Sequence, residues 1–406
     1  MMELFWLLLP VAAASGWWAA KRSISRQEVT AAERSPGYFS GLNYLLNEQP
    51  DKAIDVFIKM LEVDSDTVET HLALGNLFRR RGEVDRAIRI HQNLIARPML
   101  NREQRAQALL ELGRDYMKAG LFDRAESLFN ELGEMNMFQA QALENLLTIY
   151  QQEKDWEKCL QVAKRLEQRT GISRRRECAH YYCELAEEAQ LRKDLVKTTK
   201  LLKKAHLSDE SCVRATILQG RIEAMNGSPK SAIRTLRQVE KQDSAYLSEV
   251  LPEIIDCYRE LGNRAELVKY LRKLYERHHS ISSVLALTDF IQEDEGDEAA
   301  LRFLSGYLHA HPHLEGLNRM VGLSLKSGHT DGWGSLQILQ QVLTKLLDHR
   351  AAYQCVSCGF TAKTLHWQCP SCKSWSSIKP RDGLDEICPR LPPQIDQNPT
   401  LARHNP

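Results

Sequence analysis

Residues 68–96 read VETHLALGNLFRRRGEVDRAIRIHQNLIA, and residues 106–134 read AQALLELGRDYMKAGLFDRAESLFNELGE. In both stretches a glycine is followed by an aromatic residue after three positions and an alanine after twelve, and large residues follow at sixteen and nineteen. If this glycine is position 8 of a unit, the others are positions 11, 20, 24 and 27. A second glycine, Gly82 or Gly120, comes seven residues after the first. Because glycine readily forms a left-handed C-cap, the pattern predicts pairs of helices joined by tight turns.

The same frame recurs along the chain with a period of 34 residues, interrupted by insertions of four and five residues, and two weaker units follow. The residues at position 8 are Gly41, Gly75, Gly113, Leu147, Ala186, Gly220, Ile255 and Leu287, and a truncated unit begins near Val321. We therefore predict an all-α superhelical solenoid of eight or nine repeats over residues 35–330. A closing helix over 331–350 is expected to cover the last exposed face. Its apolar stripe is Leu336, Leu339, Val342, Leu343, Leu346 and Leu347.

The residue types in this frame explain how such a solenoid would pack. Small residues at positions 8 and 20 let the two helices of a unit approach closely, and large apolar groups at 11, 24 and 27 are expected to fill the space between units. In this the chain resembles the tetratricopeptide repeat (TPR) family over roughly residues 35–330.

A stacked solenoid has a concave surface and no preformed catalytic pocket, so the expected activity is binding of an extended peptide or of another protein's helix. Polar residues on the exposed side of the first helix of each unit are candidates for contact with such a partner. For each of them the alternative is that it is ordinary solvent-exposed surface. They are Asn43, Asn76, Arg79, Asn145 and Arg221.

A different motif lies near the C-terminal end. Tyr353–Trp375 reads YQCVSCGFTAKTLHWQCPSCKSW, in which two CxxC pairs are separated by ten residues. Two such turns can supply four thiolates to one closed tetrahedral site, formed by Cys355, Cys358, Cys369 and Cys372. A ribbon over 351–380 has too little apolar surface to fold alone, so one structural metal ion is expected.

The identity of this metal stays open. The same spacing resembles rubredoxin, which makes iron possible. We favour zinc, because an electron carrier would normally be a free small domain, whereas this ribbon is fused to a solenoid. Ligand type alone does not choose between the two ions.

Residues 1–20 predict a transmembrane anchor. Leu4–Ala20 contains no charged residue and is just long enough to cross a bilayer. The cations that follow are Lys21, Arg22 and Arg26. They place the rest of the chain on the cytoplasmic side and begin a juxtamembrane linker over 21–34. A cleaved signal peptide is the alternative, but its n-region should be basic and the only charge before the apolar run is Glu3.

Composition narrows the classes of function. The 54 basic and 53 acidic residues leave a formal charge of +1, which gives no global field for a polyanion, so nucleic acid is not expected as a partner. The motifs GxxxxGK, HExxH and GxSxG are absent from the sequence, and an enzyme is not expected. Residues 381–406, rich in Pro, Asn and Gln, are expected to be disordered.

The order of anchor, solenoid and ribbon resembles the lipopolysaccharide assembly protein B family over nearly the whole chain. In the ribbon the matching residues are Cys355, Cys358, Gly359, Phe360, Thr361, Ala362, Thr364, Trp367, Cys369, Pro370, Ser371, Cys372, Trp375 and Ile378 to Pro380. The resemblance implies a single-pass protein of the bacterial inner membrane that regulates lipopolysaccharide biosynthesis. It would act as an adaptor that promotes degradation of the deacetylase LpxC by the membrane protease FtsH, and it would contact an inner-membrane regulator that reports lipopolysaccharide level.

Two other functions stay open. One is a general scaffold for envelope assembly without a proteolytic role, and the other is an iron-binding redox protein. A monomer and a homodimer are both compatible with the sequence. The tail after Pro380 departs from the family pattern.

Overall fold

The computed structural model describes residues 40–381 except 42, 45, 48, 64–67 and 327–332. The predicted anchor over 1–20, the linker over 21–34 and the predicted tail beyond Arg381 lie outside these residues. Within the described ranges, none of the helices has both the length and the apolar character needed to span a bilayer.

The chain forms two compact units, Met1–Ile172 and Ser173–Pro406. The first unit begins, in the described residues, with helical residues from position 40. Its further helices are α3 (Pro50–Val63), α4 (Val68–Arg80), α5 (Val84–Ile95), α6 (Arg102–Lys118), α7 (Phe122–Glu134), α8 (Gln139–Glu153) and α9 (Trp156–Thr170). Each helix packs on the next, as expected for a solenoid of helix pairs.

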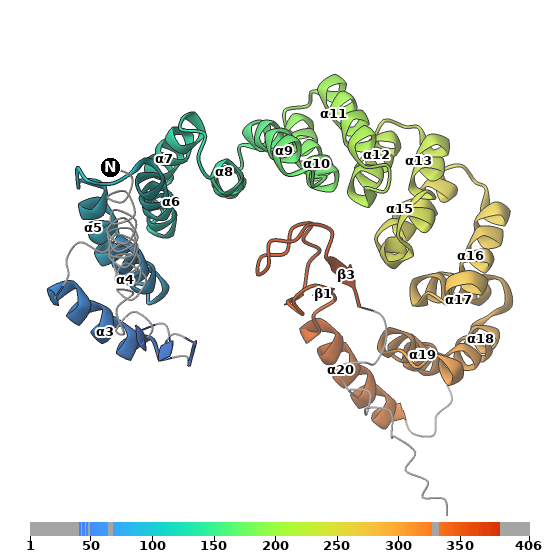
Figure 1. Cartoon of the computed structure of the whole chain (residues 1–406). Coiled ribbons are helices and arrows are strands. Elements are labelled where there is room, and N and C mark those ends of the chain that lie inside the picture. The colour runs from blue at the N-terminus through green and yellow to red at the C-terminus, as the bar shows by residue number, and fades with distance from the viewer. Residues whose placement is uncertain are drawn as a thin grey trace, which may run out of the picture. The chain divides into compact units, whose positions relative to one another are not determined.

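The second unit continues the helix pairs and ends in the ribbon (Figure 1). Its helices are α10 (Arg175–Leu191), α11 (Leu195–Ser208), α12 (Val213–Met225), α13 (Pro229–Leu236), α14 (Val239–Gln242), the 3-10 helix η1 (Ser244–Tyr246), α15 (Leu247–Glu260), α16 (Arg264–His278), α17 (Ile281–Glu295), α18 (Asp297–Ala310), α19 (Leu314–Lys326) and α20 (Trp333–His349). The strands are β1 (Tyr353–Cys355), β2 (Thr361–Ala362) and β3 (Ile378–Pro380).

The glycines at position 8 make room for the side chain at position 24 of the same unit. A Cβ atom added to Gly41, Gly75, Gly113 or Gly220 would lie 2.4 to 2.6 Å from that side chain. These side chains are Phe57, His91, Phe129 and Leu236. Position 24 therefore packs inside its own unit, and the expectation that it fills the space between units is incomplete.

In the fourth unit the large residue is at position 8 and the small residue is at position 24. Position 8 is Leu147 and position 24 is Ala163, and both side chains are buried. Large and small residues thus alternate between the two positions, which preserves the volume between the helices. This exchange explains why the repeat continues without a glycine at Leu147.

The predicted helix-ending glycines Gly82 and Gly120 are confirmed, and Gly227 and Gly262, which also lie seven residues after position 8 of their units, share their conformation. Gly82, Gly120, Gly227 and Gly262 have φ angles of 83, 75, 69 and 63°. This left-handed conformation carries no steric penalty for glycine. After Gly82, the amide of Glu83 donates to the carbonyl of Phe78, which satisfies a carbonyl at the end of α4.

Helix α20 covers α19 with only part of its apolar stripe. Leu336, Leu343 and Leu347 pack in a cluster with residues of α19. Leu339, Val342 and Leu346 are 41, 48 and 49 % exposed. The stripe is wider than the surface that one neighbouring helix covers, so the prediction that all six residues close the solenoid is only half right.

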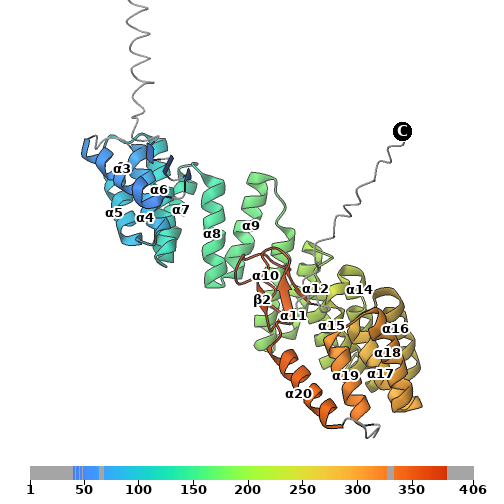
Figure 2. The same cartoon turned by 90° about the horizontal axis from the view of Figure 1, so that it is seen from below.

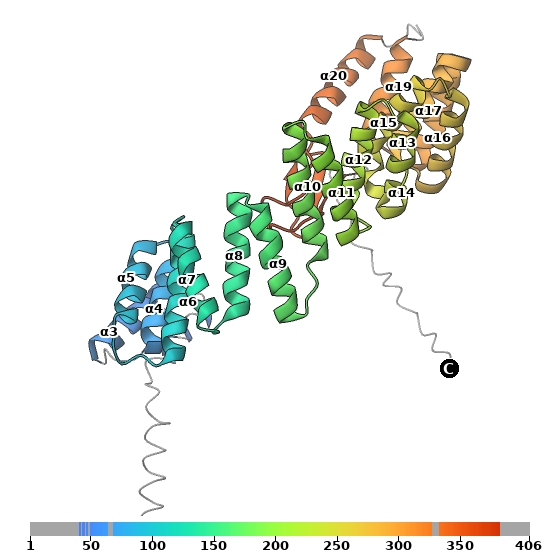
Figure 3. The same cartoon turned by 90° about the horizontal axis from the view of Figure 1, so that it is seen from above.

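The ribbon is a three-stranded antiparallel sheet in the order β2-β1-β3. In Figure 1 its strands lie on the inner side of the arc that α10 to α19 form. Figures 2 and 3 place the ribbon beside α10 in two further views.

Candidate metal centre and its contacts with the repeats

The four ribbon cysteines converge on one point. The Sγ atoms of Cys355 and Cys372 lie 3.7 Å apart, as do those of Cys358 and Cys369. All four Sγ atoms lie within 4.8 Å of one another. A tetrahedron with metal–sulfur bonds of about 2.3 Å has edges of about 3.8 Å, so the set fits one tetrahedral ion.

Two similar turns hold these cysteines. The amide of Gly359 donates to the carbonyl of Cys355, and the amide of Lys373 donates to the carbonyl of Cys369, each at 2.9 Å. Gly359 and Lys373 both have positive φ angles, 77 and 59°. Cys355 and Cys369 are buried, and every cysteine that the structure describes is free of disulfide bonds. The turns thus aim four thiols at one site and leave no position for a catalytic water.

Two ribbon tryptophans stack on rings of the repeats. The Trp367 ring lies 5.4 Å from that of Tyr246 at 28°, and the Trp375 ring lies 4.8 Å from that of His180 at 20°. Trp375 also meets Tyr181 edge-on at 5.8 Å. These ring contacts join the ribbon to α10 and η1.

Polar contacts fix the orientation of the ribbon. The Tyr246 hydroxyl donates to the carbonyl of Ile378 at 2.8 Å, and the Tyr353 hydroxyl donates to Glu249 Oε1 at 2.8 Å. Lys379 Nζ lies 2.8 Å from Asp243 Oδ2. The ribbon is therefore held by η1 and α15 as well as α10, and Lys363 Nζ also donates to the carbonyl of Asp348 in α20 at 2.9 Å.

His180 is neutral in this contact. Burial, with Arg214 and Arg176 nearby, lowers the pKa of His180 to about 3. Its Nε2 lies 2.7 Å from Ser376 Oγ, and its buried Nδ1 makes no hydrogen bond within the described residues. Protonation would place an unpaired N–H in the interface.

Arg214 lies beside the contact between the ribbon and the repeats. Its side chain is 4 % exposed, pairs with Glu184 and Glu187 at 2.8 and 2.9 Å, and lies over the Trp367 ring at 6.0 Å. Sequence reasoning missed His180, Arg214 and Tyr246, because no motif marks single residues inside a repeat.

Family models match three parts of the chain. One described as rubredoxin metal binding domain matches residues 353–380, one described as tetratricopeptide repeat matches 70–105, and one described as PPR repeat matches 114–137. The chain is 43% identical over 389 residues to the Escherichia coli (strain K12) protein named Lipopolysaccharide assembly protein B, which covers 95% of this chain and 100% of that protein. The chain belongs to the lipopolysaccharide assembly protein B family.

A second member of the lipopolysaccharide assembly protein B family, from Haemophilus influenzae, is 36% identical over 94% of this chain and 98% of its own length. Among solved structures, the chain is similar to one in "Structure of Naa15/Naa10 bound to HypK-THB", with a TM-score of 0.40 and 15% identity over 78% of this chain and 52% of that chain.

The ribbon covers part of the inner side of the second unit. The ribbon of the same chain contacts α10, η1 and α15 there. A peptide could bind these residues only if the ribbon left them. Peptide binding on the concave surface elsewhere in the repeats remains a prediction.

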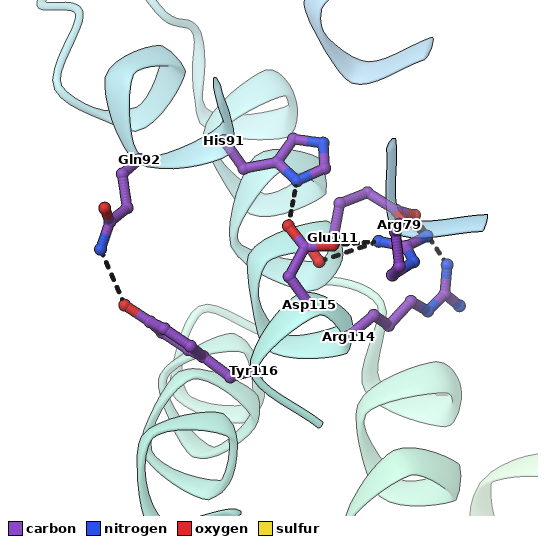
Figure 4. Close-up of polar contacts among 7 residues, drawn as sticks. All are labelled: Arg79, His91, Gln92, Glu111, Arg114, Asp115 and Tyr116. Carbon is purple, nitrogen blue, oxygen red and sulfur yellow. Dashed lines mark hydrogen bonds and ion pairs between the residues drawn. The ribbon is translucent and has the colours of Figure 1, made fainter. Parts of the chain in front are cut away.

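Two of the predicted groove residues, Arg79 and Arg221, pair with acids of neighbouring repeats, and Figure 4 shows the pairs of Arg79. Arg79 NH2 lies 2.6 Å from Glu111 Oε2, and Arg79 NH1 lies 2.8 Å from Asp115 Oδ1. His91 Nδ1 contacts the other oxygen of Asp115, whose side chain is fully buried. Arg221 Nε lies 2.8 Å from Glu253 Oε1.

The three asparagines differ in exposure. Asn43 is exposed, whereas Asn76 and Asn145 are half-buried. Partner binding by Asn43, Asn76, Arg79, Asn145 and Arg221 remains a prediction.

Proposed function

We propose that this chain is a non-enzymatic, membrane-tethered adaptor that regulates lipopolysaccharide biosynthesis by promoting degradation of LpxC by FtsH. The observation that carries the proposal is the 43% identity over the entire length of the Escherichia coli protein named Lipopolysaccharide assembly protein B. Stacked helix pairs supply extended surfaces for binding other proteins, which is what an adaptor requires.

The proposal assigns a role to each part of the chain. Leu4–Ala20 anchors it in the inner membrane with the repeats in the cytoplasm, which raises their effective concentration near membrane proteins. The repeats contact FtsH and LpxC, and the anchor helix with its flank contacts the inner-membrane regulator. The chain acts as a monomer or a homodimer. The ribbon cysteines hold one zinc ion, whose chemistry is structural because it joins the two CxxC turns.

The test is the half-life of LpxC after a translation block. Cells would carry the intact chain, a chain lacking Leu4–Ala20, a Cys355→Ser/Cys358→Ser chain, or a Cys178→Ser control. Cys178 lies in α10 outside the metal site. We expect LpxC to persist severalfold longer with the first two variants than with the intact chain, while the control behaves like the intact chain.

The alternatives make different predictions. If the half-life is unchanged even when the whole chain is deleted, the proteolytic role is wrong and a general envelope-assembly scaffold takes its place. A redox protein would yield a coloured product with thiolate-to-iron absorption, whereas the zinc form is colourless. Metal analysis of the purified full chain separates these two cases.

A further inference from the structure

Helix α11 has one side that is both basic and apolar. Its sequence, LVKTTKLLKKAHLS, contains four lysines and no acidic residue. The buried side is formed by Thr198, Leu201, Leu202 and Ala205. The opposite side, which we call the α11 face, consists of Val196, Lys197, Lys200, Lys203, Lys204 and Leu207. Residues three and four apart share one side of a helix, so these six side chains form one surface.

The apolar members of the α11 face are unusually exposed. Val196 is 82 % exposed and Leu207 is 85 % exposed, and the lysines between them are exposed as well. Leu191, at the end of α10, is 85 % exposed and is followed by Arg192 and Lys193. The apolar side chains therefore lie among cations at both ends of the helix.

The lysines of the α11 face have no acidic partner. Lys204 lies over the Tyr182 ring at 5.7 Å, and among the residues that the structure describes no carboxylate pairs with any of the four. The nearest acid in sequence, Asp194, accepts the backbone amide of Lys197 as an N-cap. Their charge thus remains available for an external partner.

Positive charge is concentrated in this part of the chain. Residues 191–204 contain six cations and one acid, a net charge of +5, whereas the whole chain has a formal charge of +1. The α11 face therefore attracts a polyanionic surface even though the molecule as a whole does not.

We propose that the α11 face docks on a bilayer surface that contains anionic phospholipid. Lysines close to such a surface are attracted to it individually, and exposed apolar side chains among them can enter the boundary between headgroups and acyl chains. Protein interfaces are depleted in lysine, which disfavours a protein as the occupant.

The position of the α11 face suits such docking. Figure 1 shows α11 on the outer side of the arc of the second unit, while the ribbon lies on its inner side. Binding to lipid through α11 would therefore leave the ribbon and its contacts undisturbed. The inference goes beyond the proposed adaptor role, because it concerns which side of the second unit meets the bilayer and involves neither FtsH nor LpxC.

Lysine acetylation measured by mass spectrometry tests the proposal on the full chain. The chain would be reconstituted into nanodiscs of phosphatidylcholine alone, or with about one-third phosphatidylglycerol. We expect acetylation of Lys197, Lys200 and Lys203 to slow about five-fold or more on the anionic nanodiscs, and about 0.5 M salt to reverse this protection. Lys269 and Lys273, exposed on α16, serve as the control in the same sample and should not change.

Two variants test the apolar part of the surface. Val196→Asp/Leu207→Asp should reduce the protection of the three lysines, whereas Met99→Asp, at a site 92 % exposed in the first unit, should leave it intact. Equal acetylation on the two kinds of nanodisc, or equal protection of Lys269, would overturn the proposal. Protection that requires an added acidic protein would also overturn it and assign the α11 face to a protein partner.

Discussion

One missing methyl group decides how closely two helices pack in several of these repeats. We expect Gly113→Ala to lower the free energy of unfolding by about 1–3 kcal/mol, because the new Cβ would lie 2.6 Å from the Phe129 ring. Gly133, in α7, has nothing within 4 Å of such an atom. Gly133→Ala should therefore be neutral or stabilise by up to about 1 kcal/mol. Denaturant unfolding of both variants measures the difference, and equal effects would contradict the packing of position 8 against position 24.

A second residue-scale prediction concerns pH. The pKa of His180 is about 3 in the folded chain and about 6.5 in an unfolded one, so the unfolded chain binds the extra proton between these values. The stability that depends on neutral His180 is fully present above pH 6.5 and falls as the pH drops towards 3. The slope is at most about 1.4 kcal/mol per pH unit.

This effect is measured by the protease sensitivity of residues 353–380 between pH 7 and pH 5. The His180→Gln variant should lose the His180 part of the slope. Metal content measured at each pH separates protonation of His180 from acid release of the ion. An identical slope in the variant and the intact chain would show that His180 does not contribute.

At the scale of elements, the ribbon is held by contacts of unequal strength. Tyr246→Phe leaves the carbonyl of Ile378 without its buried donor and should destabilise docking by about 1–3 kcal/mol. Lys379→Ala removes an ion pair whose side chains are 34 and 28 % exposed, and should cost less than about 1 kcal/mol. Hydrogen exchange of residues 353–380 measures the loss of docking stability in both variants. A larger loss for Lys379→Ala than for Tyr246→Phe would contradict this ranking.

At the scale of the whole molecule, removal of the metal should affect one unit and not the other. The ribbon lacks the apolar area to fold without its ion, and its rings cover His180 and Tyr246 in the second unit. Repeats contact mainly their neighbours, so the loss should not spread far along the chain. With a chelator, we expect faster hydrogen exchange in α10, α15 and the ribbon, and unchanged exchange over residues 68–153. A uniform change along the chain would show that the units unfold together.

The metal centre was predictable because its signal is local. Two CxxC turns ten residues apart define four ligands without any knowledge of the rest of the chain. The surface of the repeats on which the ribbon docks was not predictable from the sequence. His180 and Ser376 are 196 residues apart, and neither belongs to a motif. Arg79 and Arg221 fit the pattern of exposed groove residues equally well, yet both pair with acids of neighbouring repeats.

The sequence by itself determined the helix pairs and their ends, because these depend on residues close in sequence and recur with a fixed period. It also predicted the four cysteines that the structure brings together, because the two CxxC pairs are local. Only the tertiary structure decided that the ribbon packs against α10, η1 and α15, that half of the α20 stripe stays exposed, and that the α11 lysines pair with no carboxylate among the described residues. Those outcomes depend on which surfaces the curvature of the solenoid brings together. Contacts between segments that are distant in the sequence produce no repeating pattern of residues, so the sequence alone does not predict them.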